Sequence, residues 1–484
     1  MTGDKPIMNP IAPDHLFSHW EKDEIISYDC PEGGYADRQS LMPGEQIQFH
    51  ISTSRRDQEI LIYREGHHRK QVAAIPAPNL ELQAVNPDQP YANGFGWRPS
   101  LVFTIPDEWP SGVYVAQFLT GLGVREILFI VRPSVPTAPI LWVLADNTYQ
   151  AYTVTGGKSS YNYHSSDEAY SSRLSFDRPY PLDGTGSFLI WDQPLLAWLE
   201  REGIRADICS QVDVAKNPDI LTGYNLMLRN GHDEYWTNEE LQAVDRYISH
   251  GGNAAFFCGN NIYWQIRYEQ NGRQMLVYKD PASWPAGMTE ADCRDPVAAT
   301  DPDAETTLYQ RLPGSKIDTI REILGCWQTG MVNYFWKPSD DEIWPGAAPL
   351  GTRLLSPETG DGGYTVQRPD HWALAGSNLK KGDVFGRDET ICGTEVDGLD
   401  IEWRDGLPYP SGRDGVPLDW EILATTKIAY LDQHRFGEGG VVCREGRNGR
   451  GTVVNAATIE WAHGLETSEP VKQITRNVID RLSR

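Results

Sequence analysis

The sequence predicts an α/β protein preceded by an all-β region: an immunoglobulin-like sandwich followed by a doubly wound parallel sheet. Three observations lead to this prediction. Short alternating strands separated by Gly and Pro fill residues 28–133. Residues 132–139 carry three prolines in eight positions, which indicates a linker. From residue 140 onward, apolar strands alternate with amphipathic helices, the pattern of β-α-β units with parallel strands.

The predicted elements follow one another in this order. Sandwich strands are expected at 46–51, 59–64, 100–105, 113–119 and 127–131. Strands of the main sheet are expected at 140–144, 204–208, 224–230, 253–258 and 451–455, with helices at 193–202, 237–250 and 469–482. The second helix has Thr237 as its N-cap, and Glu240, three residues on, predicts a capping box.

The length of 484 residues is too great for one compact core. We expect a short segment at 1–27, the sandwich at 28–133 and the α/β domain at 134–484, with insertions at about 270–450. The formal net charge of −24 argues against nucleic-acid and anionic-membrane partners, because phosphates would be repelled.

The cysteines and the apolar runs indicate in which cellular compartment the protein is expected. The seven cysteines are an odd number without a C-x-x-C pair, which predicts neither a disulfide framework nor a cysteine zinc site. The sequence has no signal-peptide pattern and no apolar run approaching the roughly 20 residues of a membrane span. We therefore expect a soluble cytoplasmic protein.

A polar elbow follows the predicted strand at 224–230. After Gly231 come four groups that can carry protons or bind metal, and we predict that they are catalytic: His232, Asp233, Glu234 and Tyr235. In open α/β sheets, ligands bind outside the carboxyl ends of the strands, where this elbow lies. The alternative is structural, because acids at the start of a helix also stabilise its dipole.

Other loops dense in Tyr, Asn, His and Trp should meet the elbow at the same edge. Such side chains suit a neutral polar substrate, for example an amide or a sugar. The predicted substrate-binding residues are Tyr149, Tyr163, His164, Asn261, Trp264 and His463. The sequence contains no Gly-rich phosphate loop. It also contains no G-x-S-x-G elbow, and this second absence argues against a serine hydrolase.

Several motifs occur in a fixed order: Pro-Ser-Gly-Val-Tyr at 110–114, Thr-Tyr-Gln-Ala-Tyr at 148–152, Tyr-Asn-Tyr-His at 161–164, Trp-Leu-Glu at 198–200, Gly-His-Asp-Glu-Tyr-Trp at 231–236, Gly-Asn-Asn-Ile-Tyr-Trp at 259–264 and Thr-Ile-Glu-Trp-Ala-His-Gly-Leu at 458–465. Over residues 35–480 the chain thereby resembles the large (β) subunit of N,N-dimethylformamidase. The resemblance implies a glutamine-amidotransferase or ThuA-like sheet and hydrolysis of a C–N (amide) bond in a small neutral compound. It also implies assembly into a homo-oligomer, with a small accessory subunit as a further partner.

The resemblance further implies one iron ion held by two tyrosines and a glutamate. Tyr235 is the expected tyrosine ligand and Glu305 the expected glutamate, whereas the position expected for the second tyrosine is Pro194, which cannot bind metal. The residues that could complete the set are Tyr149, Tyr163, His164 and His232. Tyrosine and glutamate oxygens are hard ligands that suit a ferric ion. Such an ion would polarise an amide carbonyl, and His232 or Glu234 would move the proton.

Two alternatives stay open. Cys258 ends a strand at the place where glutamine-amidotransferase-like folds carry their nucleophile, and His463 follows late in the chain, which allows a cysteine-dependent amidase. A cysteine at the end of an apolar strand is, however, usually part of the packing. The other alternative is a non-catalytic protein that binds a carbohydrate or small molecule in a pocket rich in Tyr and Trp.

Overall fold

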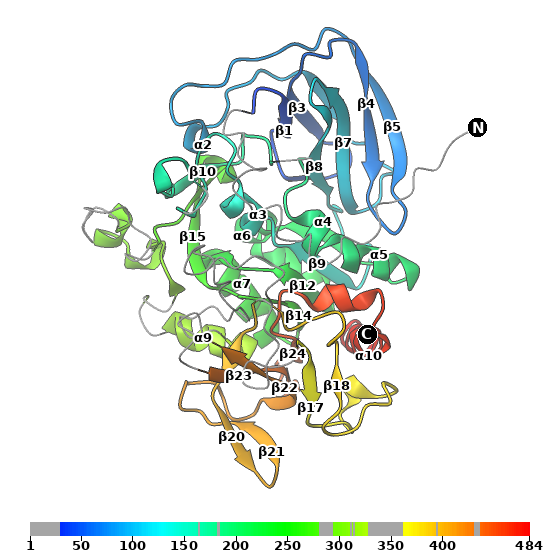
Figure 1. Cartoon of the computed structure of the whole chain (residues 1–484), viewed down its shortest axis with the longest axis vertical. Helices are drawn as coiled ribbons and strands as arrows, with labels where there is room; N and C mark the ends of the chain where they lie inside the picture. The colour runs from blue at the N-terminus through cyan, green and yellow to red at the C-terminus, as the bar shows by residue number, and fades with distance from the viewer. Residues whose placement is uncertain are drawn as a thin grey trace, which may run out of the picture.

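The structure is a computed structural model of the chain. It describes residues 30–162, 165–181, 184–279, 294–309, 312, 315–327, 362–393, 395–429 and 436–484. In Figure 1 the N-terminal strands, in blue, lie at one end of the molecule, and the hairpin of β20 (Ile401–Arg404) and β21 (Leu407–Pro410) lies at the other. The parallel strands β9 (Ile140–Leu144), β12 (Leu226–His232) and β14 (Asn253–Gly259) lie between these ends.

Two sheets form the N-terminal region. The larger is ordered β2 (Ser40–Leu41), β8 (Gly123–Val131), β7 (Gly112–Thr120), β4 (Gln58–Arg64) and β5 (Lys70–Ala77). The smaller is ordered β1 (Gly33–Ala36), β3 (Gln46–Ser52) and β6 (Leu101–Thr104). Alternate residues of β3, namely Ile47, Phe49 and Ile51, are fully buried in a core that both sheets share. All five strands predicted in this region are confirmed, with ends that differ by a few residues.

The main sheet begins with five parallel strands. Their order is β11 (Asp207–Ser210), β9 (Ile140–Leu144), β12 (Leu226–His232), β14 (Asn253–Gly259) and β24 (Val453–Asn455). Trp142 and Leu144 of β9 face one core, and Leu141 and Val143 face the other. Both faces of these strands are therefore buried, which explains their continuous apolar runs.

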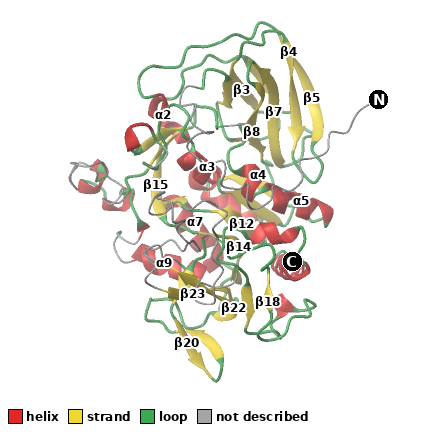
Figure 2. Ribbon diagram, in the orientation of Figure 1, coloured by secondary structure: helices red, strands yellow, loops and turns green. Residues whose placement is uncertain are grey.

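Helices cover both faces of the parallel strands, as Figure 2 shows in red. One core includes residues of α4 (Phe188–Trp191), α5 (Gln193–Arg201) and α10 (Glu469–Leu482). The other includes residues of α6 (Gln211–Lys216), α7 (Asn238–Ser249) and α9 (Ser315–Leu324). Within the described ranges, no helix is both long and apolar enough to cross a membrane.

An antiparallel half extends the main sheet beyond β24, so the predicted parallel sheet accounts for only part of it. The order continues with β23 (Phe436–Arg444), β22 (Glu421–Ala429), β17 (Tyr364–Val366) and β18 (Val384–Phe385), while β19 (Gly398–Leu399) pairs with β23. These strands come from residues that the sequence predicted as an insertion. Antiparallel strands need only short turns between them, which fits the many short strands and turns of this stretch.

The remaining elements are short. A four-stranded sheet is ordered β10 (Arg173–Ser175), β16 (Gln274–Leu276), β15 (Trp264–Glu269) and β13 (Tyr235–Thr237), and β20 (Ile401–Arg404) pairs with β21 (Leu407–Pro410). The short helices are α2 (Pro90–Asn93), α3 (Asp146–Tyr152), η3 (Ser166–Glu168), η4 (Pro218–Gly223), η5 (Gln270–Gly272), η7 (Pro296–Ala299), η8 (Pro302–Ala304), η11 (Trp372–Leu374) and η12 (Trp461–Leu465).

Ion pairs join the N-terminal sheets to the α/β region. Arg64 pairs with Glu200 of α5 at 2.5 Å, and the backbone N–H of His67 donates to the same carboxylate at 2.8 Å. Arg132 pairs with Asp213 of α6 at 2.9 Å. These contacts hold the two regions against each other, while the domain boundaries at 27/28 and 133/134 stay predictions.

Candidate functional site

Gly231 begins the elbow at the carboxyl end of β12. Its φ of +73° is in the left-handed region, and a Cβ placed on it would lie 2.7 Å from the Cβ of Trp191. Glycine is therefore required for both the backbone conformation and the close approach of Trp191. From here the chain passes through Asp233 and Glu234 into β13, which leaves the main sheet and pairs with β15.

Arg229 organises one side of the elbow. Its guanidinium, fully buried, donates to Asp233 through Nε at 2.7 Å and through Nη2 at 2.5 Å, and to Glu240 through Nη1 at 2.8 Å. It also lies 4.3 Å from the ring centroid of Trp236. Two carboxylates thus share one buried cation, and Asp233 serves as its bidentate partner.

The same contacts correct the predicted capping box of α7. The Thr237 hydroxyl accepts from the backbone N–H of Glu240 at 3.1 Å, so Thr237 is the N-cap. The carboxylate of Glu240, however, accepts from Arg229 and from the side chain of Gln211. The Glu240 side chain therefore bonds to Arg229 and Gln211 in place of the return bond of a capping box. Burial raises its pKa to about 8, although Arg229 opposes this shift.

Glu234 lies at the centre of a second cluster. The Tyr161 hydroxyl is 2.8 Å from both carboxylate oxygens, and the Tyr152 hydroxyl is 3.2 Å from Oε2. The two hydroxyls are 2.8 Å apart, and Trp264 Nε1 donates to Oε1 at 3.0 Å. Glu234 is only 3% exposed. The elbow therefore turns two adjacent acids to different sides: Asp233 to Arg229, and Glu234 to a group of hydroxyls.

Tyr235 and Lys279 extend this cluster. The hydroxyls of Tyr235 and Tyr161 are 2.6 Å apart, and Lys279 Nζ donates to the Tyr235 hydroxyl at 2.6 Å. The ammonium also lies 3.4 Å from the ring centroid of Tyr161 and 4.5 Å from that of Trp264. Burial lowers the pKa of Lys279 to about 7, although the carboxylates of Glu234 and Glu395 oppose this shift.

His232 forms the third part of the site. Its Nε2 is 2.8 Å from Glu395 Oε2 and 3.4 Å from Glu234 Oε2. Burial alone would lower the pKa of His232, but the carboxylates of Glu395 and Glu234 outweigh it and raise the pKa to about 9. The ring is therefore an imidazolium at neutral pH, held among acids.

Asn260 connects this pair to the loop after β14. Its Nδ2 donates to Glu395 Oε2 at 3.1 Å and lies 3.2 Å from His232 Nε2. The residue has a φ of +52° and is 1% exposed. Its Oδ1 is buried and has no hydrogen-bond partner among the residues that the structure describes. An unpaired buried acceptor of this kind is costly, so it is a candidate contact for a substrate or a water molecule.

Four other predicted residues lie around or outside this centre. The hydroxyl of Tyr149 donates to Asp192, which also accepts from Asn230 at 3.1 Å. His463 stacks on Trp191 at 5.5 Å between ring centroids, and Trp191 in turn lies 6.3 Å from His232. Tyr163 and His164 lie outside the described residues.

Asn261 and Cys258 anchor the loop after β14. The Cys258 thiol, fully buried, donates to Asn261 Oδ1 at 2.8 Å, and Asn261 Nδ2 donates to Asp397 at 2.8 Å. Burial raises the pKa of Cys258 well above its usual value. Because the thiolate is the nucleophilic form, this thiol is poorly suited to the cysteine-dependent alternative.

The chemistry of three side chains in this cluster suits an iron ion, and none of the three is among the ligands that the resemblance implies. Tyr152, Tyr161 and Glu234 supply two phenol oxygens and a carboxylate within 3.2 Å of one another. These are hard ligands, and the two phenols would give up their protons on binding a ferric ion. Tyr235 lies beside this group, whereas the carboxylate of Glu305 pairs with Arg294 at 2.9 Å.

Of the residues in this centre, Glu395 and Lys279 carried no recognisable signal in the sequence. Both come from stretches without clear periodicity, far from the elbow along the chain. Tyr152 and Tyr161 did have a signal, because each lies in a motif of the resemblance, at 148–152 and 161–164.

An open sheet with buried acids, hydroxyls and an imidazolium at its carboxyl edge defines an α/β protein with a candidate active site. A family described as "N,N-dimethylformamidase beta subunit-like, C-terminal" matches residues 59–475, and the chain belongs to this family. It is 33% identical over 213 residues to the N,N-dimethylformamidase beta subunit of Paracoccus aminophilus, and 26% identical over 214 residues to that of an Alcaligenes species. Each match covers 35% of this chain and 28% of the relative's length.

Proposed function

We propose that this chain hydrolyses the C–N bond of a small neutral amide at the cluster around Glu234. The observation that carries the proposal is the meeting of Tyr152, Tyr161 and Glu234 beside the pair of His232 and Glu395. The names of the relatives, amidase subunits, point to the same reaction. We extend the proposal to the fold, with an immunoglobulin-like sandwich and an amidotransferase or ThuA-like sheet.

Tyr152, Tyr161 and Glu234 would hold the iron ion. When bound there, the ion would supply Lewis-acid chemistry, polarising an amide carbonyl and lowering the pKa of a water molecule. Trp264 Nε1 donates to Glu234 Oε1 at 3.0 Å and so orients this carboxylate. Such an outer contact fixes the direction of a ligand and tunes its basicity.

The proton transfers fall to His232 and Glu395. Hydrolysis of an amide takes a proton from the attacking water and gives one to the leaving nitrogen. His232 is charged at neutral pH and can donate through Nε2, which Glu395 holds at 2.8 Å. Glu395 accepts the proton of the water as it attacks, before His232 protonates the leaving nitrogen. The Oδ1 of Asn260, buried without a partner among the described residues, positions that water.

The test is turnover of a panel of small amides by the iron-loaded protein, measured as released amine. Tyr161→Phe and Glu234→Gln should each lower kcat by at least about a hundredfold, the scale of a lost catalytic group. Tyr224→Phe is the matched control, because it also removes a buried hydroxyl, bonded to Asp207 at 3.0 Å, but before the amino end of β12. Amide binding without turnover would favour the binding-protein alternative and contradict the proposal.

We also propose that the chain assembles, with itself or with a small accessory chain. The relatives' names describe them as subunits, which supports this expectation. Light scattering of the purified chain gives its mass in solution. A mass equal to the 54.4 kDa of one chain at all concentrations would contradict self-assembly.

A further inference from the structure

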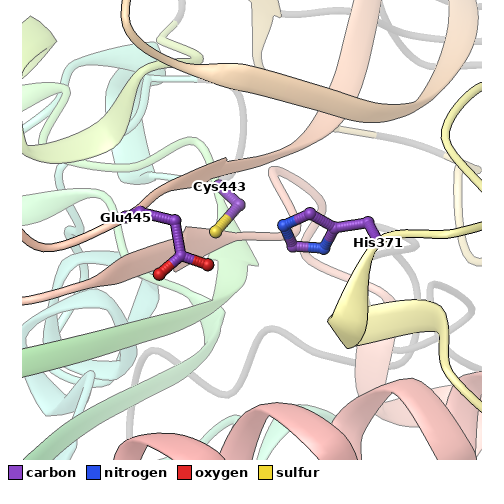
Figure 3. A group of neighbouring side chains, drawn as sticks. All are labelled: His371, Cys443 and Glu445. Carbon is purple, nitrogen blue, oxygen red and sulfur yellow. The ribbon is translucent and has the colours of Figure 1, made fainter.

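A second group of potential metal ligands lies away from the candidate active site. His371, Cys443 and Glu445 each offer one ligand atom, and these atoms all lie within 4.8 Å of one another (Figure 3). Cys443 pairs in register with Val454 of β24, and Val454 pairs with Ala255 of β14, four residues before Gly259. The group therefore lies on the antiparallel side of β24, about four residues away from the carboxyl ends of the parallel strands.

Strand geometry brings these side chains together. Cys443 is the second-last residue of β23, and Glu445 directly follows the strand; residues two positions apart along an extended chain project from the same face. Glu421 of β22 is the register partner of Cys443 and adds a second carboxylate on that face. His371 precedes η11, and Figure 3 shows its ring directed toward Cys443.

The contacts around the group orient its ligand atoms. His371 Nδ1 accepts from the backbone N–H of Ala373 at 3.2 Å, while Nε2 is buried and has no hydrogen-bond partner in the described part of the chain. The carboxylate of Glu445 accepts from Trp372 Nε1 and pairs with Arg481 at 3.3 Å. Outer contacts of this kind are what fix ligating carboxylates in metal sites.

We propose that His371, Cys443 and Glu445 bind a borderline-soft divalent metal ion of the zinc type. An imidazole, a thiolate and a carboxylate suit zinc, and a water molecule or Glu421 would supply the fourth ligand. Binding releases the Cys443 thiol proton to solvent. It also moves the ring proton of His371 from Nε2 to Nδ1, giving up one long neutral hydrogen bond to Ala373.

This second metal would join three segments of the fold. η11 supplies Trp372 beside His371, β23 supplies Cys443, and α10 supplies Arg481, which pairs with Glu445 and lies 4.4 Å from the Trp372 ring. The metal would therefore fasten the C-terminal helix to the antiparallel half of the sheet, as structural zinc does elsewhere.

The test uses cobalt(II) as a spectroscopic substitute for zinc on the full chain, after metal is removed with a chelator. Wild type should show a thiolate-to-cobalt charge-transfer band that saturates at one cobalt per chain. Cys443→Ala should lose the band, and His371→Gln should weaken cobalt affinity by at least about tenfold. Cys209→Ala is the matched control, since it removes another fully buried cysteine and should keep the band.

Two further variants keep the result decisive. Tyr161→Phe alters only the proposed iron site, so the thiolate band should persist in it. If Cys443→Ala fails to fold, Glu445→Gln replaces it, because that side chain is 27% exposed and the change keeps its shape; cobalt affinity should again fall. A wild type without a thiolate band, an unchanged band in Cys443→Ala, or an unchanged cobalt affinity in Glu445→Gln would overturn the proposal.

Discussion

Asp233→Asn should destabilise the fold far more than the neighbouring change Glu234→Gln. Asp233 is fully buried and accepts two hydrogen bonds from Arg229, at 2.7 and 2.5 Å. Removing one charge of a buried ion pair costs about 3–5 kcal/mol. Glu240 remains at 2.8 Å from Arg229, and asparagine keeps one acceptor. We therefore expect Asp233→Asn to lower the unfolding free energy by about 3 kcal/mol, the lower end of that range.

Among the residues that the structure describes, no guanidinium pairs with Glu234, and its ion pair with His232 is long, at 3.4 Å. Glutamine keeps an acceptor oxygen for the Tyr161 and Tyr152 hydroxyls, which can rotate. We expect Glu234→Gln to lower the unfolding free energy by about 1 kcal/mol or less and to abolish turnover. Urea unfolding of the wild type and the two variants, monitored by circular dichroism, measures both changes in unfolding free energy. Equal destabilisation by the two changes, or a larger loss in Glu234→Gln, would refute this assignment of the two acids.

Three further outcomes follow. Gly231→Ala should cost about 1–3 kcal/mol of unfolding free energy, because φ is +73° and Trp191 lies in the way of a Cβ. Burial raises the pKa of Asp192 from 3.8 to about 7, so the native state keeps a proton that the unfolded chain has lost. In a urea-unfolding series, the unfolding free energy of the wild type should therefore fall by up to about 4 kcal/mol relative to that of Asp192→Asn as the pH rises from 4 to 7. Trp264→Phe removes the donor to Glu234 and should weaken iron binding by about tenfold in a chelator competition, whereas an unchanged affinity would contradict that role.

The local elements could be predicted because periodicity and burial agree in them. The alternation of β3 and the helical spacing of α10 follow from which side chains face a core, and the predicted helix at 469–482 has the bounds of α10. The same reasoning failed for α3, where Tyr149 and its neighbours were expected in a loop. Nearly every residue of α3 is buried, so it lacks the polar face that marks a helix in a sequence.

The candidate site could be predicted only in part, since it depends on directions that spacing does not give. His232 and Glu234 were found because they follow a buried strand without a spacer. The sequence does not reveal that the Asp233 side chain points toward Arg229, because this direction depends on the φ and ψ angles of the elbow. Glu395 and Lys279 reach the site through long-range contacts that leave no local pattern.

The ligand set for iron is the central claim, and the visible spectrum of the iron-loaded protein tests it most directly. Tyrosinate bound to ferric iron gives an intense charge-transfer band. We expect this band at one iron per chain in wild type, weakened in Tyr152→Phe and Tyr161→Phe, and retained in Tyr235→Phe, because the Tyr235 hydroxyl accepts from Lys279 Nζ at 2.6 Å and is not in the proposed ligand set. A colourless protein without stoichiometric iron, or a band lost only in Tyr235→Phe, would contradict the account.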